Sequence, residues 1–254
     1  MSDSQPLLGK TALVTGASRN LGAVTALTLA QQGASVVVHY QNSEVNAQEV
    51  ADAAAGYGVS AYIVKADLAN GQEVRAMIEK TLDQLGKPID ILVNNAGPFN
   101  GDPFSTLTEA EWDRVLNINL KAVYLATQLV ASGMRANGWG RIINVSAGSA
   151  YIRNHGIYGL AKSALITLTE ALALELGPEI TVNAVAPGQI AESGPDISVI
   201  DPTFVGRAIA HSPGGRLATR QEVANIIAWL CSPLADMITG ETIPIDAGWR
   251  FNRF

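Results

Sequence analysis

Two residues able to move a proton together, Tyr158 and Lys162, stand four positions apart in HGIYGLAKSALITLTEALALEL. The segment is rich in Ala and Leu and predicts a helix, so both side chains lie on one helix face. A free tyrosine has a pKa of about 10 and is a poor base at neutral pH. A neighbouring ammonium group favours the phenolate and lowers that pKa. The pair is therefore a candidate to protonate a developing alkoxide or to accept a proton from an alcohol.

A glycine-containing turn is the second candidate for chemistry. The strand-like run Thr11–Thr15 leads into GASRNLG and then into a helical segment. Gly16 permits a tight turn, and Gly22 lets the helix pack close to the preceding strand. The free N–H groups and partial positive charge of the helix N-terminus suit a pyrophosphate. The turn predicts a dinucleotide site that includes Gly16, Ser18, Arg19, Asn20 and Leu21.

The end of the next strand-like run, SVVVHY, indicates which dinucleotide is preferred. NAD-preferring folds usually place an acidic residue here to hold the ribose 2′-hydroxyl. This chain ends the run with His39 and Tyr40, and its first acid is Glu44 in the following helix. Arg19, with His39 and Ser43, is placed to meet a 2′-phosphate instead. We expect NADP(H) to be preferred over NAD(H).

The elements that must position these residues alternate between strand and helix. Helical runs separate most of seven strand-like segments: Thr11–Thr15, Ser35–His39, Tyr62–Lys65, Ile89–Val93, Arg141–Val145, Ile180–Val185 and Thr242–Asp246. The pattern predicts an α/β, Rossmann-type doubly wound parallel sheet with helices on both faces. No break in composition divides residues 1–254, so one domain is expected. Residues 1–9 are predicted to be a loose tail, and residues 189–215 to cover the substrate as a mobile lid.

Composition excludes several other classes of protein. The net charge of -6 and the lack of a basic cluster argue against nucleic-acid binding. No apolar run reaches the ~18 residues that would span a membrane. The single cysteine, Cys231, excludes an intrachain disulfide and favours a cytoplasmic location. The three histidines are scattered along the chain, so no metal site is expected.

Taken together, these motifs resemble the short-chain dehydrogenase/reductase family from Thr11 to about Gly248. The resemblance rests on TGASRNLG, Asp67-Leu68, Asn94-Asn95-Ala96-Gly97, Asn119, the Tyr158/Lys162 pair and Pro187-Gly188, all in the expected order. Within the family the chain is most similar to 3-oxoacyl-ACP reductases. It shares some features with pteridine reductases, namely the HY-x-x-S pattern and the absence of the middle glycine.

The resemblance implies NAD(P)(H) lying across the carboxyl edge of the sheet and an exchange of hydride with a carbonyl or alcohol. It implies that Tyr158 is the proton donor or acceptor, and that Lys162 holds the nicotinamide ribose and lowers the Tyr158 pKa. Asn119 would support a water in a proton relay. Other positions would line the cofactor: Asp67, Leu68, Asn95, Ala96, Gly97, Pro187, Gly188 and Ile190. The family also implies a homotetramer or homodimer, joined through the helices that carry Asn119 and Tyr158.

Three positions depart from the family pattern. Asn20 replaces the middle glycine of the turn, and Asn tolerates left-handed backbone better than most residues. The catalytic serine is missing, because alignment of RIINVSA puts Ala147 at its position. Ser146 is the favoured substitute, Ser149 is a second, and a third option is that no serine serves. Glu192 replaces a threonine expected to contact the nicotinamide, and Ser193 is a possible replacement.

Two alternative functions remain open from sequence. Asn20 and the segment from His39 to Ser43 favour a reductase of C=N bonds, in pteridines or imines. The Ala147 and Glu192 departures instead suggest a dinucleotide-binding regulator without catalysis, although Tyr158, Lys162 and Asn119 are intact.

Overall fold

The chain forms one seven-stranded parallel sheet. The computed structural model describes residues 5–151, 156–194, 199 and 201–251. The strand order is β3-β2-β1-β4-β5-β6-β7. The strands are β1 (Thr11–Val14), β2 (Ser35–Tyr40), β3 (Ala61–Lys65), β4 (Ile91–Asn94), β5 (Gly140–Val145), β6 (Ile180–Pro187) and β7 (Thr242–Ile245). All seven predicted strands are confirmed, with ends that shift by two residues at most.

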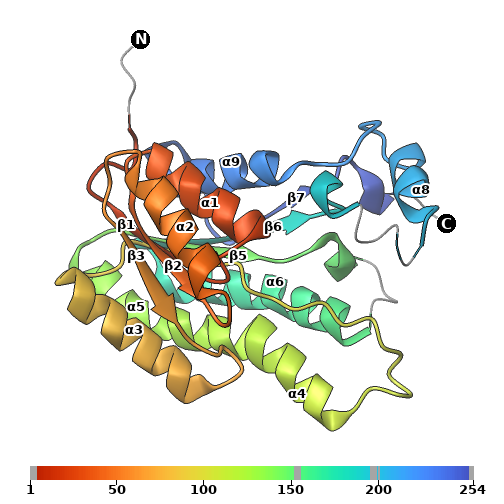
Figure 1. Cartoon of the computed structure of the whole chain (residues 1–254), viewed down its shortest axis with the longest axis horizontal. Coiled ribbons are helices and arrows are strands. Elements are labelled where there is room, and N and C mark those ends of the chain that lie inside the picture. The colour runs from red at the N-terminus through yellow and green to blue at the C-terminus, as the bar shows by residue number, and fades with distance from the viewer. Residues whose placement is uncertain (1–4, 152–155, 195–198, 200, 252–254) are drawn as a thin grey trace.

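Helices cover both faces of the sheet (Figure 1). The longer ones are α1 (Asn20–Gln31), α2 (Glu44–Ala55), α3 (Gly71–Leu85), α4 (Glu109–Leu116), α5 (Ala122–Ala136), α6 (Gly156–Leu176), α8 (Phe204–Ala210) and α9 (Arg220–Cys231). Shorter turns are η1 (Asn117–Lys121), η2 (Gly148–Tyr151), η3 (Ala191–Ser193), η4 (Pro233–Ala235) and η5 (Trp249–Phe251). One core cluster lies under α1, α2 and α9, and a second lies under α3, α5 and α6.

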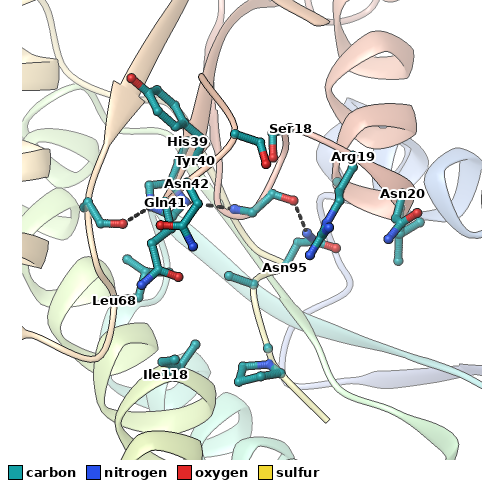
Figure 2. A pocket seen from close by; sticks show the side chains of 18 of the residues that line it. Ser18, Arg19, Asn20, His39, Tyr40, Gln41, Asn42, Leu68, Asn95 and Ile118 are labelled. Atoms are coloured by element: carbon teal, nitrogen blue, oxygen red, sulfur yellow. Dashed lines mark hydrogen bonds between the residues drawn. The ribbon is translucent and has the colours of Figure 1, made fainter. Parts of the chain in front are cut away.

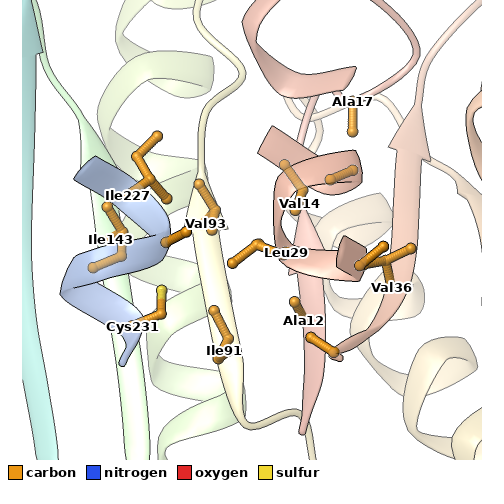
Figure 3. Packing of buried hydrophobic residues seen from close by; sticks show 14 of the residues in the cluster. Ala12, Val14, Ala17, Leu29, Val36, Ile91, Val93, Ile143, Ile227 and Cys231 are labelled. Atoms are coloured by element: carbon orange, nitrogen blue, oxygen red, sulfur yellow. The ribbon is translucent and has the colours of Figure 1, made fainter. Parts of the chain in front are cut away.

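The strands are apolar because both faces of the sheet are buried. Figure 3 shows Leu29 of α1 and Ile227 of α9 packing on Val14, Val93 and Ile143. Each of these five side chains is fully buried. Strands covered on both sides carry continuous β-branched and aliphatic runs, which is why the sequence revealed them.

The sheet topology creates the crevice in which ligands of such folds bind. The chain runs from β1 outward to β2 and β3, then crosses back so that β4 pairs with the other side of β1. All pairs are parallel, so every carboxyl end lies on one edge. The loops after β1 and β4 diverge at that edge and leave room for a ligand between them.

The N-terminal segment differs from the prediction of a loose tail. Leu7 is fully buried in the core, and its N–H donates to the carbonyl of Gln32 at 3.0 Å. Residues 5–9 therefore pack against the end of α1, because Leu7 is apolar enough to fill that corner. Residues 1–4 lie outside the described part of the chain.

Helix α6 is long and apolar enough, by length and composition, to cross a membrane. It packs against β6, η1 and η2, and 44% of its most apolar window is buried inside the fold. It also carries Tyr158 and the buried Lys162. These are the properties of a core helix, and a single such helix is weak evidence for a membrane span.

Candidate active site

The turn after β1 has the geometry of a phosphate-binding loop. Gly16 has φ 63° and Asn20 has φ 53°, so both adopt the left-handed region that the sequence predicted. A side chain at Gly22 would place its Cβ 2.3 Å from the Gly16 carbonyl oxygen, so only glycine fits there. No acidic residue stands in the first turn of α1, and Arg19 makes no side-chain cap. The first N–H groups of α1 remain available to an anion.

A cavity of about 360 Å³ opens in front of this turn (Figure 2). Twelve of the predicted cofactor residues line it: Gly16, Ser18, Arg19, Asn20, Leu21, His39, Tyr40, Ser43, Leu68, Asn95, Ala96 and Gly97. Gly22, which the sequence marked for helix packing, also lines it, and sequence reasoning missed Gln41, Asn42, Ala66, Pro98, Arg114 and Ile118. Gln41 and Asn42 follow β2 directly, so the position of a strand end was a signal for them. Arg114 and Ile118 come from α4 and η1, and nothing local marks them.

The described lining of this cavity carries positive charge and no carboxylate. None of its described lining residues is Asp or Glu, so no carboxylate is placed to hold a 2′-hydroxyl or to repel a phosphate. Two cations line it. Arg114 is held by Glu111, with Nε to Oε1 at 2.8 Å. Arg19 is exposed at the start of α1 and faces the cavity.

His39 is not placed as a phosphate ligand, contrary to the sequence prediction. Its ring is 2% exposed, Nδ1 accepts from the Gly16 N–H at 2.9 Å, and Nε2 lies 3.2 Å from the Ala66 carbonyl oxygen (Figure 2). Burial lowers the His39 pKa to about 4, so the ring is neutral and donates through Nε2. His39 joins the turn after β1 to the end of β3 and carries no charge toward the cofactor.

Two further predicted cofactor residues hold the site together from within. The Asn95 side-chain amide donates to the carbonyls of Thr15 and Gly16, which fixes the turn against β4. Asp67 does not line the cavity. Its carboxylate accepts from the Ala69 N–H at 2.9 Å, so it shapes the loop that presents Leu68.

A second cavity, of about 320 Å³, lies at the same edge beyond β5 and β6. Its described lining is Phe99, Ala147, Gly148, Ser149, Tyr158, Pro187, Gly188, Gln189, Ile190, Ser193, Phe204 and Trp249. The predicted residues Tyr158, Pro187, Gly188 and Ile190 are among them. Residues 195–198 and 200 of the predicted lid lie outside the described part of the chain.

Tyr158 and Lys162 are close, but their protonation differs from the sequence expectation. Lys162 Nζ lies 5.6 Å from the centroid of the Tyr158 ring and donates to the Val145 carbonyl at 2.7 Å. Burial raises the pKa of Tyr158 to about 12, and burial lowers the pKa of Lys162 to about 7. The expected lowering of the Tyr158 pKa by Lys162 is not seen, because loss of hydration outweighs the attraction at this distance.

Asn119 lies behind the pair, inside the π-turn η1. Its amide nitrogen donates to the carbonyls of Val115 and Pro98, while its Oδ1 is buried without a partner. A Cβ at Gly97 would lie 2.4 Å from Asn119 Oδ1 and 2.8 Å from Lys162 Nζ. Gly97 thus lets both groups approach the cleft. The unpaired acceptor suits a water or a hydroxyl donor, as the predicted proton relay requires.

The two candidate serines have different surroundings. Ser146 is 2% exposed, and its Oγ donates to the Lys162 carbonyl at 2.9 Å. It is therefore bound to α6, and it does not line the cavity. Ser149 lines the cavity with Tyr158, and its buried Oγ has no hydrogen-bond partner. The geometry favours Ser149, the second choice from sequence, because the 3-10 turn η2 carries it to the cleft.

Glu192 does not line the cavity that holds Tyr158. Its carboxylate accepts the N–H of Arg220 at 3.1 and 3.2 Å, in the first turn of α9. A negative charge is favourable there because of the partial positive charge of the helix N-terminus. Ser193, the replacement considered from sequence, lines the cavity.

A doubly wound sheet, a glycine turn opening on a helix N-terminus, and a Tyr/Lys pair at one edge define a class: dinucleotide-dependent oxidoreductases. Comparison with known proteins agrees, since residues 16–250 match the family described as enoyl-(acyl carrier protein) reductase. The chain belongs to the short-chain dehydrogenase/reductase family of NAD(P)-dependent oxidoreductases.

Its relatives differ in substrate and cofactor. The 3-oxoacyl-[acyl-carrier-protein] reductase FabG of Staphylococcus aureus is 37% identical over 242 residues, covering 94% of this chain and 97% of the relative. A gluconate 5-dehydrogenase from Burkholderia cenocepacia, solved with NADP and tartrate, has a TM-score of 0.90, 30% identity and 99% coverage of both chains. A 7α-hydroxysteroid dehydrogenase, solved with NADH and a 7-oxo bile acid, has a TM-score of 0.90 and 35% identity, covering 98% of this chain and 97% of its own.

Proposed function

We propose that this protein is an NADPH-dependent oxidoreductase that exchanges hydride between the nicotinamide and a carbonyl or alcohol substrate. One observation carries the proposal: Tyr158 and the unpaired hydroxyl of Ser149 line the same cavity, and Lys162 is buried beside them. The nucleotide cavity lies at the same sheet edge, with Gly97 at its border. A cofactor spanning that edge would bring its reactive ring to Tyr158.

Each residue has a distinct task in this proposal. The cofactor, when bound, supplies or accepts the hydride. Tyr158 delivers a proton to the carbonyl oxygen as the alcohol forms, or removes it in the reverse direction. Ser149 donates a hydrogen bond to the same oxygen and orients it. Lys162 would hold the hydroxyls of the nicotinamide ribose, and Asn119 would hold a water of the proton relay behind it.

The raised pKa of Tyr158 determines how each direction of the reaction should depend on pH. A tyrosine whose pKa is near 12 is neutral at pH 7 and is ready to donate. Oxidation of an alcohol needs the phenolate, so it should speed up with rising pH. The preference for NADPH rests on Arg19 and on the lack of acidic residues in the described lining of the nucleotide cavity.

The test is NADPH consumption against pools of ketones, keto esters and cyclic imines, with wild-type protein and Tyr158→Phe. We expect turnover with a carbonyl pool, and a loss of at least about 100-fold in kcat in the variant. Tyr158→Phe retaining full activity would contradict the mechanism. Turnover of the imine pool alone would support the C=N alternative. Tight NADPH binding without turnover on any pool would support the regulator.

Ser149→Ala separates the two serines. We expect kcat/KM to fall about 10-fold or more, because the carbonyl oxygen loses its second donor. Ser146→Ala should mainly lower the stability of the protein, since the Ser146 hydroxyl is bound to α6. A larger catalytic loss for Ser146→Ala than for Ser149→Ala, at equal stability, would reverse the assignment.

We also propose that the protein is a cytoplasmic homotetramer or homodimer acting on a small-molecule substrate. Exposed apolar side chains on α5 and α6 support association, because the fold leaves them without an intrachain cover.

A further inference from the structure

The cavity that holds Tyr158 has aromatic walls from three separate parts of the chain. Phe99 follows β4, Phe204 begins α8, and Trp249 lies in η5. Phe99 is 64% exposed, and its ring meets the Tyr158 ring edge to face, with centroids 5.2 Å apart and planes at 69°. An exposed aromatic ring beside the reacting hydroxyl is a surface that an apolar ligand would cover.

The described walls of this cavity carry no charged side chain. Their polar groups are Tyr158, Ser149, Gln189 and Ser193, which are all neutral at pH 7. A carboxylate or phosphate placed here would lose hydration without gaining a counter-charge from these described walls, and this is costly.

Among the described residues of α8, α9, η3 and η5 and the segments that lead into them, several charged side chains already have partners. Arg250 is paired with Asp246 at 3.0 Å, and Arg207 with Asp201 at 2.5 Å. Arg216 binds Glu222, and Glu192 accepts from the start of α9. Recruiting one of these arginines to an anionic substrate would break an existing ion pair.

From these walls we propose, building on the proposed function, that the substrate is a small neutral ketone or alcohol with an aromatic or alicyclic ring next to the reacting carbon. Phe99, Phe204 and Trp249 contact the ring, and Tyr158 and Ser149 bind the oxygen. The volume of about 320 Å³ is at the low end for ligand pockets, and the bound nicotinamide would take part of it, because Pro187, Gly188 and Ile190 line the same cavity. The remaining room favours a single ring. Keto acids, phosphorylated compounds and open-chain sugars are poor substrates.

Acetophenone and benzoylformate test the charge, because they share a phenyl ketone and differ by a carboxylate in place of a methyl group. We expect kcat/KM with NADPH to be at least about 10-fold higher for acetophenone. Phe99→Ala and Phe204→Ala should each raise KM for acetophenone about 10-fold. Phe104→Ala is the matched control, since Phe104 is also exposed but lies outside this cavity. Equal or better turnover of benzoylformate would overturn the inference, as would unchanged KM in both cavity variants.

A binding measurement separates failure of this inference from failure of the proposed function. Calorimetry on Tyr158→Phe protein saturated with NADPH reports binding of either ketone without turnover. Tighter binding of acetophenone supports the inference even if the wild-type protein reduces no carbonyl. The lack of reduction would then contradict only the proposed function. If Tyr158-dependent turnover of another ketone is found while acetophenone binds no better than benzoylformate, the function stands and the inference is wrong.

Discussion

Burial, more than mutual attraction, sets the protonation of the catalytic pair. Tyr158 and Lys162 both shift toward their neutral forms, the tyrosine to a pKa of about 12 and the lysine to about 7. The spacing of the two residues was visible in the sequence, but the depth at which α6 buries them was not. A lysine that is 2% exposed and bound to one backbone carbonyl is poised near neutral pH.

Lys162 should therefore make stability depend on pH. Its pKa is about 7 in the folded protein and 10.5 ordinarily, so the unfolded chain binds more protons between these values. Stability contributed through this group rises from pH 7 to 10.5 and is lost as the pH falls toward 7. Lys162→Met removes this slope, so we expect the Tm difference between variant and wild type to change steadily from pH 7 to 10.

The slope of the Tm difference against pH separates the titration of Lys162 from the other effects of the substitution. Loss of the bond to the Val145 carbonyl costs about 1–3 kcal/mol at every pH and shifts the whole curve. Other titrating groups act equally in both proteins and cancel. A pH-independent Tm difference, measured by calorimetry without cofactor, would contradict the low pKa of Lys162.

The sequence predicted that Arg19 and His39 both meet a 2′-phosphate, but their substitution should affect cofactor binding differently. Arg19→Ala removes a charge-assisted bond worth about 1.5–3 kcal/mol, so the Kd for NADPH should rise about 10- to 100-fold while that for NADH stays unchanged. His39→Phe leaves the Gly16 N–H and the Ala66 carbonyl unpaired, which disturbs the turn that serves both cofactors. We expect His39→Phe to raise the Kd for NADPH and the Kd for NADH by similar factors.

Fluorescence titration with both cofactors measures these constants. Arg75→Ala is the control for Arg19, because Arg75 is exposed on α3 and does not line the cavity. A selective loss of NADPH binding in His39→Phe would restore His39 as a phosphate ligand. Equal losses of both cofactors in Arg19→Ala would remove the basis for NADPH preference.

At the scale of elements, Glu192 stands where the family has a threonine and instead contacts the start of α9. The segment after β6 brings Glu192 to the first turn of α9, where a capping box of Thr219 and Glu222 already satisfies other N–H groups. Thr219 and Glu222 are three positions apart, so a capping box is local in the sequence. The sequence marked Glu192 as a departure from the family pattern but did not reveal its contact with α9, because that contact joins residues 28 positions apart.

Glu192→Gln should weaken this end of α9. The variant keeps an oxygen acceptor but removes the charge, at an expected cost of about 0.3–1 kcal/mol and ~2 °C in Tm. The loss should shrink in 1 M NaCl, since salt screens an exposed charge. Glu79→Gln on α3 is the control, because Glu79 is exposed and away from a helix N-terminus. Equal Tm values for the two variants would show that the contact does not stabilise α9.

At the scale of the whole molecule, the fold was predictable and part of the site was not. The seven strands have the continuous apolar runs that a doubly covered sheet requires, so the sequence predicted their bounds and the parallel, doubly wound architecture. Arg19, in the turn after β1, and Tyr158, near the start of α6, each line one of the two cavities, and local motifs in the sequence had marked both. His39 lines the first cavity, but its ring is bound within the fold, and Ser146 and Glu192 line neither cavity. Each of the three is bound to a partner that only folding brings near.

Association through α5 and α6 is the prediction that concerns the whole molecule. Tyr124 of α5 is 44% exposed, while Leu160 and Leu174 of α6 are 46% and 89% exposed. A twofold interface repeats each contact, so one unfavourable residue acts twice. We expect the wild-type protein to exceed monomer mass in light scattering at micromolar concentration, and Leu174→Arg to lower that mass. Val45→Arg is the control, since Val45 is 71% exposed on α2, on the opposite face of the sheet. A monomeric wild-type protein, or equal effects of the two variants, would remove α6 from the interface.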